Sequence, residues 1–339
     1  MPRGSVHFSA EELVRVLSHY DTGIIYQVKP LAAGSRRVPK MVIISERGKF
    51  LLKRRQKVRD DIHRVLFAHA VQAHLADKLF PVISLVPVRN ENNTILQLDN
   101  HIYEFFKFIT GFRYDGSSEA TIDTGSQLAK FHQYLEDFPC PWKPPKATFH
   151  NSAAVRRHLK TIETQGPHPQ LQEAAKALMS LYDNSSNRVD ELGFDSWGQQ
   201  VVHGDWHPGN MLFYNHKLTA VLDFDSVKLA PPVTDLANGM LQFSIVGNRP
   251  NPADWPDYLD QAKLVQFLNG YQQVIELEEN QLNSLLDLMV ETIIAEAVLP
   301  VAQTGSFGNL SGADFLTMIH RKAQWIDKNR EKLAEAINS

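Results

Sequence analysis

Apolar residues in the first hundred positions recur with helical spacing in two places. Ser9 and Glu12 form a capping-box pattern ahead of an apolar run, which predicts a helix that ends near Tyr20. Residues 60–79 return to the same spacing and predict a second helix. The apolar face of this second helix is expected to comprise Ile62, Leu66, Ala70, Ala73 and Leu75.

Short runs rich in β-branched and aromatic residues predict strands between and after these helices. Residues 41–45 and 49–53 flank a Glu-Arg-Gly turn, and residues 94–98 and 101–109 flank an Asp-Asn turn. Both pairs have the spacing of antiparallel hairpins. The beginning of the chain therefore predicts a small antiparallel sheet that carries at least one helix.

The rest of the chain has a different pattern. From residues 126–138 onward most segments have a helical period, and strands are expected only near 199–224. A chain of 339 residues is too long for one small core and suits two lobes. We therefore expect an α+β fold with a nucleotide-binding lobe at residues 1–106 and a larger, mainly helical lobe at residues 107–339.

The composition is that of a folded protein without bulk attraction for nucleic acid. Hydrophobic residues make up 43% and charged residues 22%, both ordinary values for a globular chain. The net charge of -3 gives no general affinity for a polyanion. The basic run KRRQKVR at 53–59 is interpreted as solvated surface, so we expect no nucleic-acid partner.

Nothing in the sequence indicates a membrane or an oxidising compartment. The first fifteen residues lack the apolar core of a signal peptide, and no run of about 18 apolar residues occurs. The single cysteine, Cys140, cannot form an intramolecular disulfide, and cysteine-rich metal motifs are excluded. We expect a cytoplasmic protein with no membrane partner.

The candidate chemistry lies in HGDWHPGNMLF (203–213), a polar stretch between two apolar, strand-like runs. Its two glycines allow backbone conformations that side chains forbid, and Pro208 stiffens the loop. Asp205 is placed to accept a proton from a substrate hydroxyl, and Asn210 offers a neutral oxygen to a metal ion. Asp223, which follows the strand-like run TAVL, brings a carboxylate to the same metal. Because Mg²⁺ is bound by few protein oxygens plus substrate phosphates, this sparse set predicts a magnesium-nucleotide site.

The order Asp205, Asn210, Asp223 is the phosphoryl-transfer arrangement of protein-kinase-like folds. With HGDWHPGN, VLDFDSV and PPVTDLA, the chain resembles the aminoglycoside phosphotransferase and choline/homoserine kinase superfamily, most closely its bacterial small-molecule kinases. The resemblance covers most of the chain, because Gly34-Ser35, Lys53, EFFKFITG and GSQLAKFH follow in the expected order. It implies a two-lobed protein-kinase-like fold with a small antiparallel sheet and a larger helical lobe.

The resemblance also implies roles for individual residues. Asp205 is the catalytic base or orients the substrate hydroxyl, and Asn210 and Asp223 hold Mg²⁺. Lys53 contacts the α- and β-phosphates of ATP from its strand; its alternative interpretation is an ordinary surface lysine at a strand end. The implied nucleotide contacts are Lys53, Gly34 and Ser35 at the phosphates, and the backbone of Lys107, Phe108 and Ile109 at the adenine ring.

Three features depart from the protein-kinase pattern. The turn LAAGSRRV lacks the full glycine-rich signature, which reduces the expected phosphate cradle. The helix at 60–79 contains no glutamate to pair with Lys53, so the partner of this lysine stays open, with His69 or Gln72 nearest the middle of the helix. The metal motif is DFD rather than DFG, and Asp225 is interpreted as an accessory carboxylate near the metal.

Four residues near the motifs also have structural interpretations. His203 is expected to order the loop through hydrogen bonds rather than to act in the chemistry. Trp206 either forms a wall of the site or packs in the core. Asp235 follows a pair of prolines and is expected to cap a helix, and the resemblance indicates a structural role for it as well. His132 lies on an amphipathic helix and is interpreted as a packed core histidine.

We therefore predict ATP- and Mg²⁺-dependent transfer of the γ-phosphate to a hydroxyl group. The expected acceptor is a small molecule, namely an amino alcohol, a homoserine-like amino acid, an aminoglycoside or a sugar. The alternatives are a protein Ser/Thr kinase of the bacterial stress-kinase type, a non-catalytic nucleotide-binding scaffold, and a metal-dependent phosphohydrolase. The hydrolase would be built on His203, Asp205, His207 and Asp223.

One further cluster bears on the acceptor. Asp254, Trp255 and Asp257 bring two carboxylates and an aromatic ring together in NPADWPDYLD. Such a cluster attracts a cationic amine by charge and by cation–π contact. The preferred interpretation is nevertheless an exposed loop that precedes the helix with Leu264 and Phe267, and amine binding is the alternative.

Overall fold

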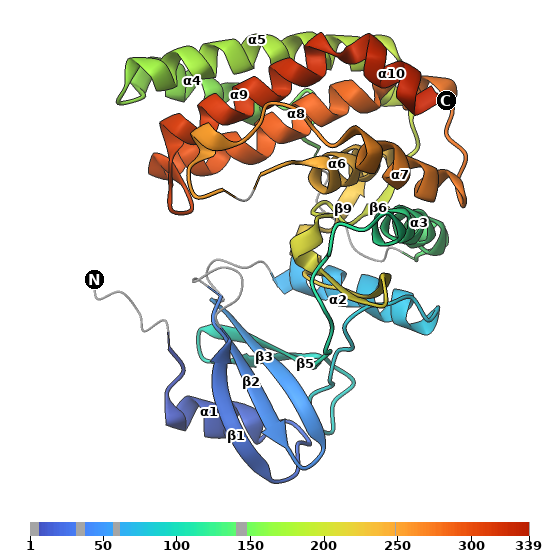
Figure 1. The fold of residues 1–339 in the computed structure, drawn as a ribbon. Coiled ribbons are helices and arrows are strands. Elements are labelled where there is room, and N and C mark those ends of the chain that lie inside the picture. The colour runs from blue at the N-terminus through green and yellow to red at the C-terminus, as the bar shows by residue number, and fades with distance from the viewer. Residues whose placement is uncertain (1–6, 32–37, 57–61, 140–147, 248, 339) are drawn as a thin grey trace.

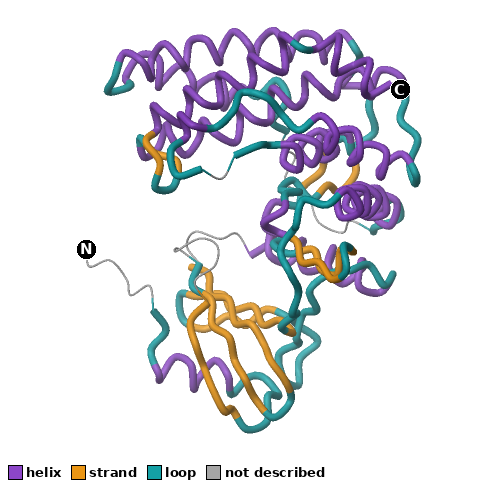
Figure 2. Tube along the Cα trace, in the orientation of Figure 1, coloured by secondary structure: helices purple, strands orange, loops and turns teal. Residues whose placement is uncertain are grey.

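The computed structural model describes residues 7–31, 38–56, 62–139, 148–247 and 249–338. They form two lobes, one built on a β-sheet near the N-terminus and a larger, mainly helical one that includes the C-terminus (Figure 1). Most strand residues gather in the first lobe, and most helices in the second (Figure 2). This arrangement confirms the expected α+β class with a small antiparallel sheet and a larger helical lobe.

The N-terminal lobe is built on one five-stranded antiparallel sheet. Its strands are β1 (Ile25–Leu31), β2 (Lys40–Ser45), β3 (Gly48–Gln56), β4 (Ile95–Leu98) and β5 (His101–Lys107). They follow the order β1-β2-β3-β5-β4, and both expected hairpins are present. β1 is not predicted by the sequence pattern, because it contains a proline and most of its residues are exposed. Both features are typical of a strand at the edge of a sheet.

Helix α1 (Ala10–Leu17) packs beside this sheet and begins as the sequence predicts. The backbone N–H of Glu12 donates to Ser9 Oγ at 3.0 Å, and both halves of the capping box are formed. The helix ends at Leu17, earlier than expected, and Tyr20 beyond it is buried.

Helix α2 (Ile62–Asp77) has its expected position, but the predicted apolar face is wrong. Of the five residues expected on that face only Leu75 is fully buried, and Ala73 is exposed. Val65 packs with residues of the sheet, whereas Phe67 belongs to the core of the helical lobe. Because the helix lies between the two lobes, it is buried on two sides, and a one-faced pattern does not describe it.

The helical lobe carries two short strand pairs near its junction with the sheet. The pairs are β6 (Gln200–Val202) with β9 (Lys228–Ala230), and β7 (Met211–Tyr214) with β8 (Lys217–Val221). They include the strands expected near 199–224 and support the polar loop. The helices are α3 (Ser118–Leu135), α4 (Ala153–Gln165), α5 (Pro169–Glu191), α6 (Val233–Ser244), α7 (Gln261–Gln272), α8 (Glu279–Thr304), α9 (Gly312–Lys328) and α10 (Arg330–Asn338). A small hairpin, β10 (Ser306–Phe307) and β11 (Leu310–Ser311), joins α8 to α9.

Helices α3 and α7 cross at a close contact between two glycines. A Cβ added at Gly125 would lie 2.0 Å from the backbone oxygen of Phe267, and one at Gly270 would lie 2.0 Å from that of Ile122. Only glycine fits at this crossing. The contact matters for the site because α3 also carries His132, which is fully buried as expected and reaches the candidate site.

The basic run at 53–59 is not a solvated surface in its described part. Lys53, Arg54 and Arg55 are 6%, 7% and 7% exposed, and each forms an ion pair with a carboxylate. Charged side chains are this buried only when paired, so these residues serve internal contacts. The last three residues of the run, like Cys140, lie outside the described residues.

No helix in the described part of the chain combines the length and the apolar character needed to cross a bilayer. The long helices that are present pack within the helical lobe instead, where α5, α8 and α9 lie against one another.

Candidate active site

The polar stretch at 203–213 forms a loop between strands, as the sequence predicts. β6 ends at Val202, and a 3₁₀ turn at Pro208–Asn210 leads into β7. Gly204 has a φ of +75°, and a Cβ there would lie 2.5 Å from the backbone oxygen of Ser226. Glycine is required both by the left-handed backbone and by the close approach, so the loop has a defined shape.

Asp235 fixes the start of this loop. Its carboxylate accepts hydrogen bonds from the backbone N–H of His203 at 2.6 Å and of Gly204 at 2.8 Å. Burial raises the pKa of Asp235, but the hydrogen bond and charge of His132 outweigh it and hold the pKa below its ordinary value. The predicted capping role is wrong, since Pro232 occupies the N-cap of α6. The structural role is confirmed, and it consists of satisfying two loop N–H groups.

His203 and Trp206 both support the loop from within the core. His203 Nε2 donates to the carbonyl oxygen of Leu222 at 3.3 Å, and burial lowers the pKa of His203, so its ring stays neutral. Trp206 is completely buried and packs on Phe131 and His203, with ring centroids 5.7 and 5.5 Å apart. It lines neither of the cavities described below, so packing is the correct interpretation of Trp206.

Asp205 and Asn210 contact each other across the loop. Asn210 Nδ2 donates to Asp205 Oδ2 at 2.8 Å and to the carbonyl oxygen of Asp205 at 3.1 Å. Burial raises the pKa of Asp205, but the neighbouring His207 and Asn210 outweigh it and hold the pKa below its ordinary value. Asp205 is therefore ionised at neutral pH and able to orient a hydroxyl group. Because Nδ2 is engaged, the Oδ1 atom of Asn210 is left for another partner.

Asp223 lies beside Asn210, after the end of β8. The backbone N–H of Leu222 donates to the carbonyl oxygen of Asn210 at 2.8 Å, which ties the two segments together. Asp223 has a φ of +58°, and its Oδ1 atom is buried without a hydrogen-bond partner among the described residues. Among these residues its nearest cation is the Lys53 ammonium group, 3.6 Å away, and no hydrogen bond occupies the oxygen. Carboxylate and amide oxygens such as those of Asp223 and Asn210 are the ligand types that a divalent cation prefers when phosphate oxygens complete its shell.

Lys53 reaches these carboxylates from the sheet. Its Nζ atom donates to both oxygens of Asp225 at 2.9 and 3.0 Å, and lies 3.6 Å from Asp223 Oδ1 and 3.8 Å from Glu104 Oε2. Burial lowers the pKa of Lys53, but the three carboxylates outweigh it and raise the pKa above its ordinary value. An ordinary surface lysine is thereby excluded. Asp225, interpreted from the sequence as an accessory group, forms an ion pair between the lobes.

Strand β5 supplies the glutamate that α2 lacks. Glu104 is 2% exposed, pairs with Arg55, and accepts a hydrogen bond from His69 Nε2 at 2.9 Å. Burial raises the pKa of Glu104, but Lys53, His69 and Arg55 outweigh it and hold the pKa far below its ordinary value. His69, a candidate partner of Lys53 in the sequence, thus acts through Glu104. The only sequence signal for Glu104 is an acidic residue inside the apolar strand IYEFF.

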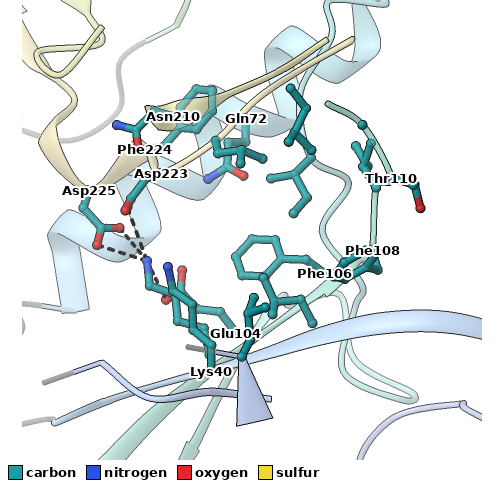
Figure 3. Close-up of a pocket in the computed structure, with 18 of the residues that line it drawn as sticks. Lys40, Gln72, Glu104, Phe106, Phe108, Thr110, Asn210, Asp223, Phe224 and Asp225 are labelled. Carbon is teal, nitrogen blue, oxygen red and sulfur yellow. Dashed lines mark hydrogen bonds and ion pairs between the residues drawn. The ribbon is translucent and has the colours of Figure 1, made fainter. Parts of the chain in front are cut away.

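A cavity of about 500 Å³ lies between the lobes, beside these groups. Lys53 lines its polar end together with Asn210, Asp223 and Asp225, and Figure 3 shows the last three. Its remaining walls are largely apolar and include Leu31, Leu51, Ile83, Phe106, Phe108 and Leu212. An apolar slot with a charged end has the character expected of a site for a planar base and its phosphates.

The segment after β5 meets this cavity slightly later than expected. Phe108 and Ile109 line the cavity, followed by Thr110 and Gly111. Lys107 does not line the cavity. Its side chain is exposed, and its backbone N–H donates to the carbonyl oxygen of Ser84 at 2.9 Å. Of the three residues predicted to contact adenine, Phe108 and Ile109 thus line the cavity and Lys107 does not. Gly34 and Ser35 lie outside the described residues.

A second cavity, of about 620 Å³, meets the first at the loop, where Gly209 lines both. Aromatic rings of Tyr114, Phe243 and Trp255 form part of its wall, and Glu296 from α8 gives it a carboxylate. The loop that carries the candidate base thus lies between a nucleotide-sized cavity and a second cavity on the helical side.

The acidic-aromatic cluster interpreted as an exposed loop is divided: Asp254 and Asp257 are exposed, and Trp255 is half-buried. Trp255 lines the second cavity, where its indole N–H donates to the carbonyl oxygen of Arg249 at 2.8 Å. Asp257 lies 3.4 Å from Arg321, and neither Asp257 nor Asp254 lines the cavity. Two other carboxylates, Asp115 and Glu296, line this cavity together with the basic residues Arg113, Lys263 and Lys322, and the sequence pattern identified neither carboxylate.

The fold and the site together define a phosphotransferase with a protein-kinase-like fold. Residues 27–277 match the Phosphotransferase enzyme family, and the chain belongs to this family. A homoserine kinase from Rhodopseudomonas palustris (strain BisA53) is 25% identical over 285 residues, which cover 82% of this chain and 79% of that protein.

Solved structures share the fold over nearly the whole chain. An amicoumacin kinase in complex with AMP-PNP and Ca²⁺ superposes with a TM-score of 0.70 at 16% identity, covering 95% of this chain and 94% of that one. A microcompartment-associated aminopropanol kinase gives 0.70 at 15% identity, covering 96% and 99%. An aminoglycoside phosphotransferase from Alicyclobacillus acidocaldarius gives 0.69 at 15% identity, covering 98% and 99%. These similarities confirm the predicted two-lobed fold.

Proposed function

We propose that this protein transfers the γ-phosphoryl group of MgATP to a hydroxyl group of a small molecule. The observation that carries the proposal is the convergence of Asn210, Asp223 and Lys53 at one end of the cavity between the lobes, with Asp205 hydrogen-bonded to Asn210. The cavity between the lobes is the proposed nucleotide site, and the second cavity is the proposed acceptor site. The amicoumacin kinase structure holds AMP-PNP and Ca²⁺, which supports a nucleotide and a divalent cation for the shared fold.

Each residue has one task in this proposal. Asn210 and Asp223 hold Mg²⁺, and the bound metal ion neutralises part of the phosphate charge. Lys53 positions the phosphates, and the 108–111 segment contacts the adenine ring. Asp205 orients the acceptor hydroxyl and takes its proton as the oxygen attacks the γ-phosphorus, and ADP leaves.

The alternative functions fit the geometry less well. A two-metal hydrolase needs a cluster of His, Cys, Asp or Glu ligands, and no group of three or more is placed for this in the described ranges. His207 instead lies 3.5 Å from Asp205 and accepts a hydrogen bond from the backbone of Gly209. A lined cavity next to the base favours a small acceptor over a protein hydroxyl. The intact set of phosphoryl-transfer residues argues against a non-catalytic scaffold.

We expect ATP with Mg²⁺ to raise the midpoint of thermal unfolding by about 4 °C at a concentration of 100 times the dissociation constant. ATP with EDTA should produce a smaller shift. Asp223→Asn should remove the Mg²⁺-dependent part of the shift, because it removes the metal-binding carboxylate. Asp195→Asn, at an exposed position away from both cavities, is the matched control. A wild-type protein that shows no shift at millimolar ATP would contradict the proposed function.

Glu296 favours an acceptor that carries a cationic amine. Its carboxylate accepts hydrogen bonds from Asn238 and, at 2.6 Å, from Gln242, and it forms no ion pair with a described basic residue. The surrounding cavity wall and the charge of Asp205 raise the pKa of Glu296 to about 7, although its side chain is exposed, and the charges of His207 and Lys228 oppose this only in part. An ammonium group would add to that opposite charge. We therefore propose an amino alcohol or an aminoglycoside-like acceptor rather than a neutral sugar.

We expect Glu296→Gln to raise KM for amine-bearing acceptors about tenfold or more, because a charge-assisted contact becomes a neutral one. KM for a neutral acceptor of the same shape should stay unchanged. In the wild type, KM for the amine should fall as pH rises through about 7, where the carboxylate forms, and this dependence should vanish in the variant. Glu279→Gln, exposed at the start of the same helix, is the control. Equal losses for amine and neutral acceptors would contradict the role of Glu296.

A further inference from the structure

Lys40 is a second lysine at the phosphate end of the nucleotide cavity. β2 and β3 are antiparallel, and Lys40 lies directly opposite Lys53 in their register. Directly opposed residues of two paired strands project to the same face of the sheet. Both side chains accordingly line the cavity, and Figure 3 shows Lys40 at the same end as Asp223 and Asp225.

The protein itself does not balance the charge of Lys40. Among the described residues no carboxylate lies within ion-pair distance of Lys40, whereas three surround Lys53. Burial lowers the pKa of Lys40, and the charge of Lys53 lowers it further, with only partial compensation from Asp223 and Asp225. Like charges opposite each other on paired strands are destabilising. An anion in the cavity would remove this unfavourable interaction.

The sequence next to Lys40 explains why a lysine is useful at this position. Kinase-like sites cover the phosphates with a glycine-rich turn, whose backbone N–H groups approach the ligand closely. Here the segment between β1 and β2 contains one glycine, Gly34, so it offers fewer positions without a side chain. Lys40 is the first residue of β2 and provides three N–H donors on a long side chain.

We propose that Lys40 is a second phosphate-binding lysine, which contacts the polyphosphate of the bound nucleotide together with Lys53. The inference rests on the proposed function and adds a positioning residue to it. Two ammonium groups would then face the phosphates from adjacent strands. Lys53 is held in place by its carboxylates, whereas Lys40 is stabilised only when the nucleotide is bound.

The test compares Lys40→Met, Lys40→Arg and a control, Lys29→Met, by calorimetric titration with MgATP, inorganic tripolyphosphate and adenosine. Lys29 is an exposed residue of β1 outside the cavity lining. We expect Lys40→Met to weaken MgATP and tripolyphosphate binding about tenfold or more and to leave adenosine binding unchanged. Lys40→Arg should stay within a few-fold of the wild type, and Lys29→Met should match it.

Thermal unfolding without ligand gives a second and independent readout. Lys40→Met should unfold at the wild-type temperature or above it, because the charge of Lys40 is disfavoured in the free protein. Lys53→Met should unfold at a lower temperature, because it removes the buried cation that Glu104, Asp223 and Asp225 share.

The outcomes separate this inference from the proposed function. Wild-type affinity for MgATP in Lys40→Met, or an equal loss for adenosine, would overturn the role of Lys40 and leave the kinase proposal intact. A wild-type protein that binds neither MgATP nor tripolyphosphate would overturn both. Should Lys40→Met fail to fold, Lys40→Gln replaces it in the same titrations, and the same results decide.

Discussion

Asp205→Asn is expected to lower kcat by about 10²- to 10⁴-fold, the usual contribution of a general base, while MgATP affinity stays close to that of the wild type. The substitution removes the negative charge that orients the acceptor hydroxyl and takes its proton. It keeps the size of the side chain and an oxygen that can accept the hydrogen bond from Asn210 Nδ2. Single-turnover phosphoryl transfer and a separate titration with MgATP would measure the two quantities.

The same measurements decide between two roles for this carboxylate. A loss of MgATP affinity as large as the loss in kcat would place Asp205 among the metal ligands. Wild-type turnover in the variant would contradict any role in proton transfer. Asp195→Asn makes the same chemical change at an exposed site and should leave both quantities unaltered.

The proximity of the three polar residues of the candidate site could be predicted because they are local in sequence. Asp205, Asn210 and Asp223 lie on one loop and the end of the next hairpin, so their order along the chain determines their proximity. The hairpins of the sheet are local in the same sense. For the same reason the position of Phe108 beside the cavity could be expected, since it follows directly from a strand that the pattern identifies.

The residues that the sequence did not reveal depend on contacts between distant segments. Glu104 reaches Lys53 because β5 pairs with β3, and Lys40 faces Lys53 because of the β2–β3 register. Glu296 enters the second cavity from a helix about 90 residues beyond Asp205. Each looks ordinary in its own segment, as a charged residue in or beside an apolar run. The buried face of α2 was misassigned for a related reason, because the partners on its two sides come from both lobes.

Glu104→Gln is expected to lower the free energy of unfolding by about 3–5 kcal/mol, the range measured when one partner of a buried ion pair is removed. Glu104 is 2% exposed and is shared by Lys53, Arg55 and His69, so its loss leaves buried positive charge without its main partner. Chemical denaturation at neutral pH measures the change. MgATP binding should weaken as well. Without the charge of Glu104, Asp225 is the nearest hydrogen-bond acceptor of Lys53, and this contact holds the ammonium group away from the phosphates.

Glu12→Gln provides the matched control on the same sheet. Glu12 pairs with Arg54 at 2.8 Å and accepts a hydrogen bond from Tyr103 at 2.7 Å, but its side chain is 19% exposed. Water can compensate part of that loss, so a smaller destabilisation is expected for Glu12→Gln.

The pH dependence of the free energy of unfolding gives a second check on the role of Glu104. Because the folded-state pKa of Glu104 lies far below the ordinary value of 4.5, the stabilisation is complete above that value and is lost as pH falls below it. The difference between the wild type and Glu104→Gln should therefore shrink in acid, and a constant difference would show that shape rather than charge accounts for the effect.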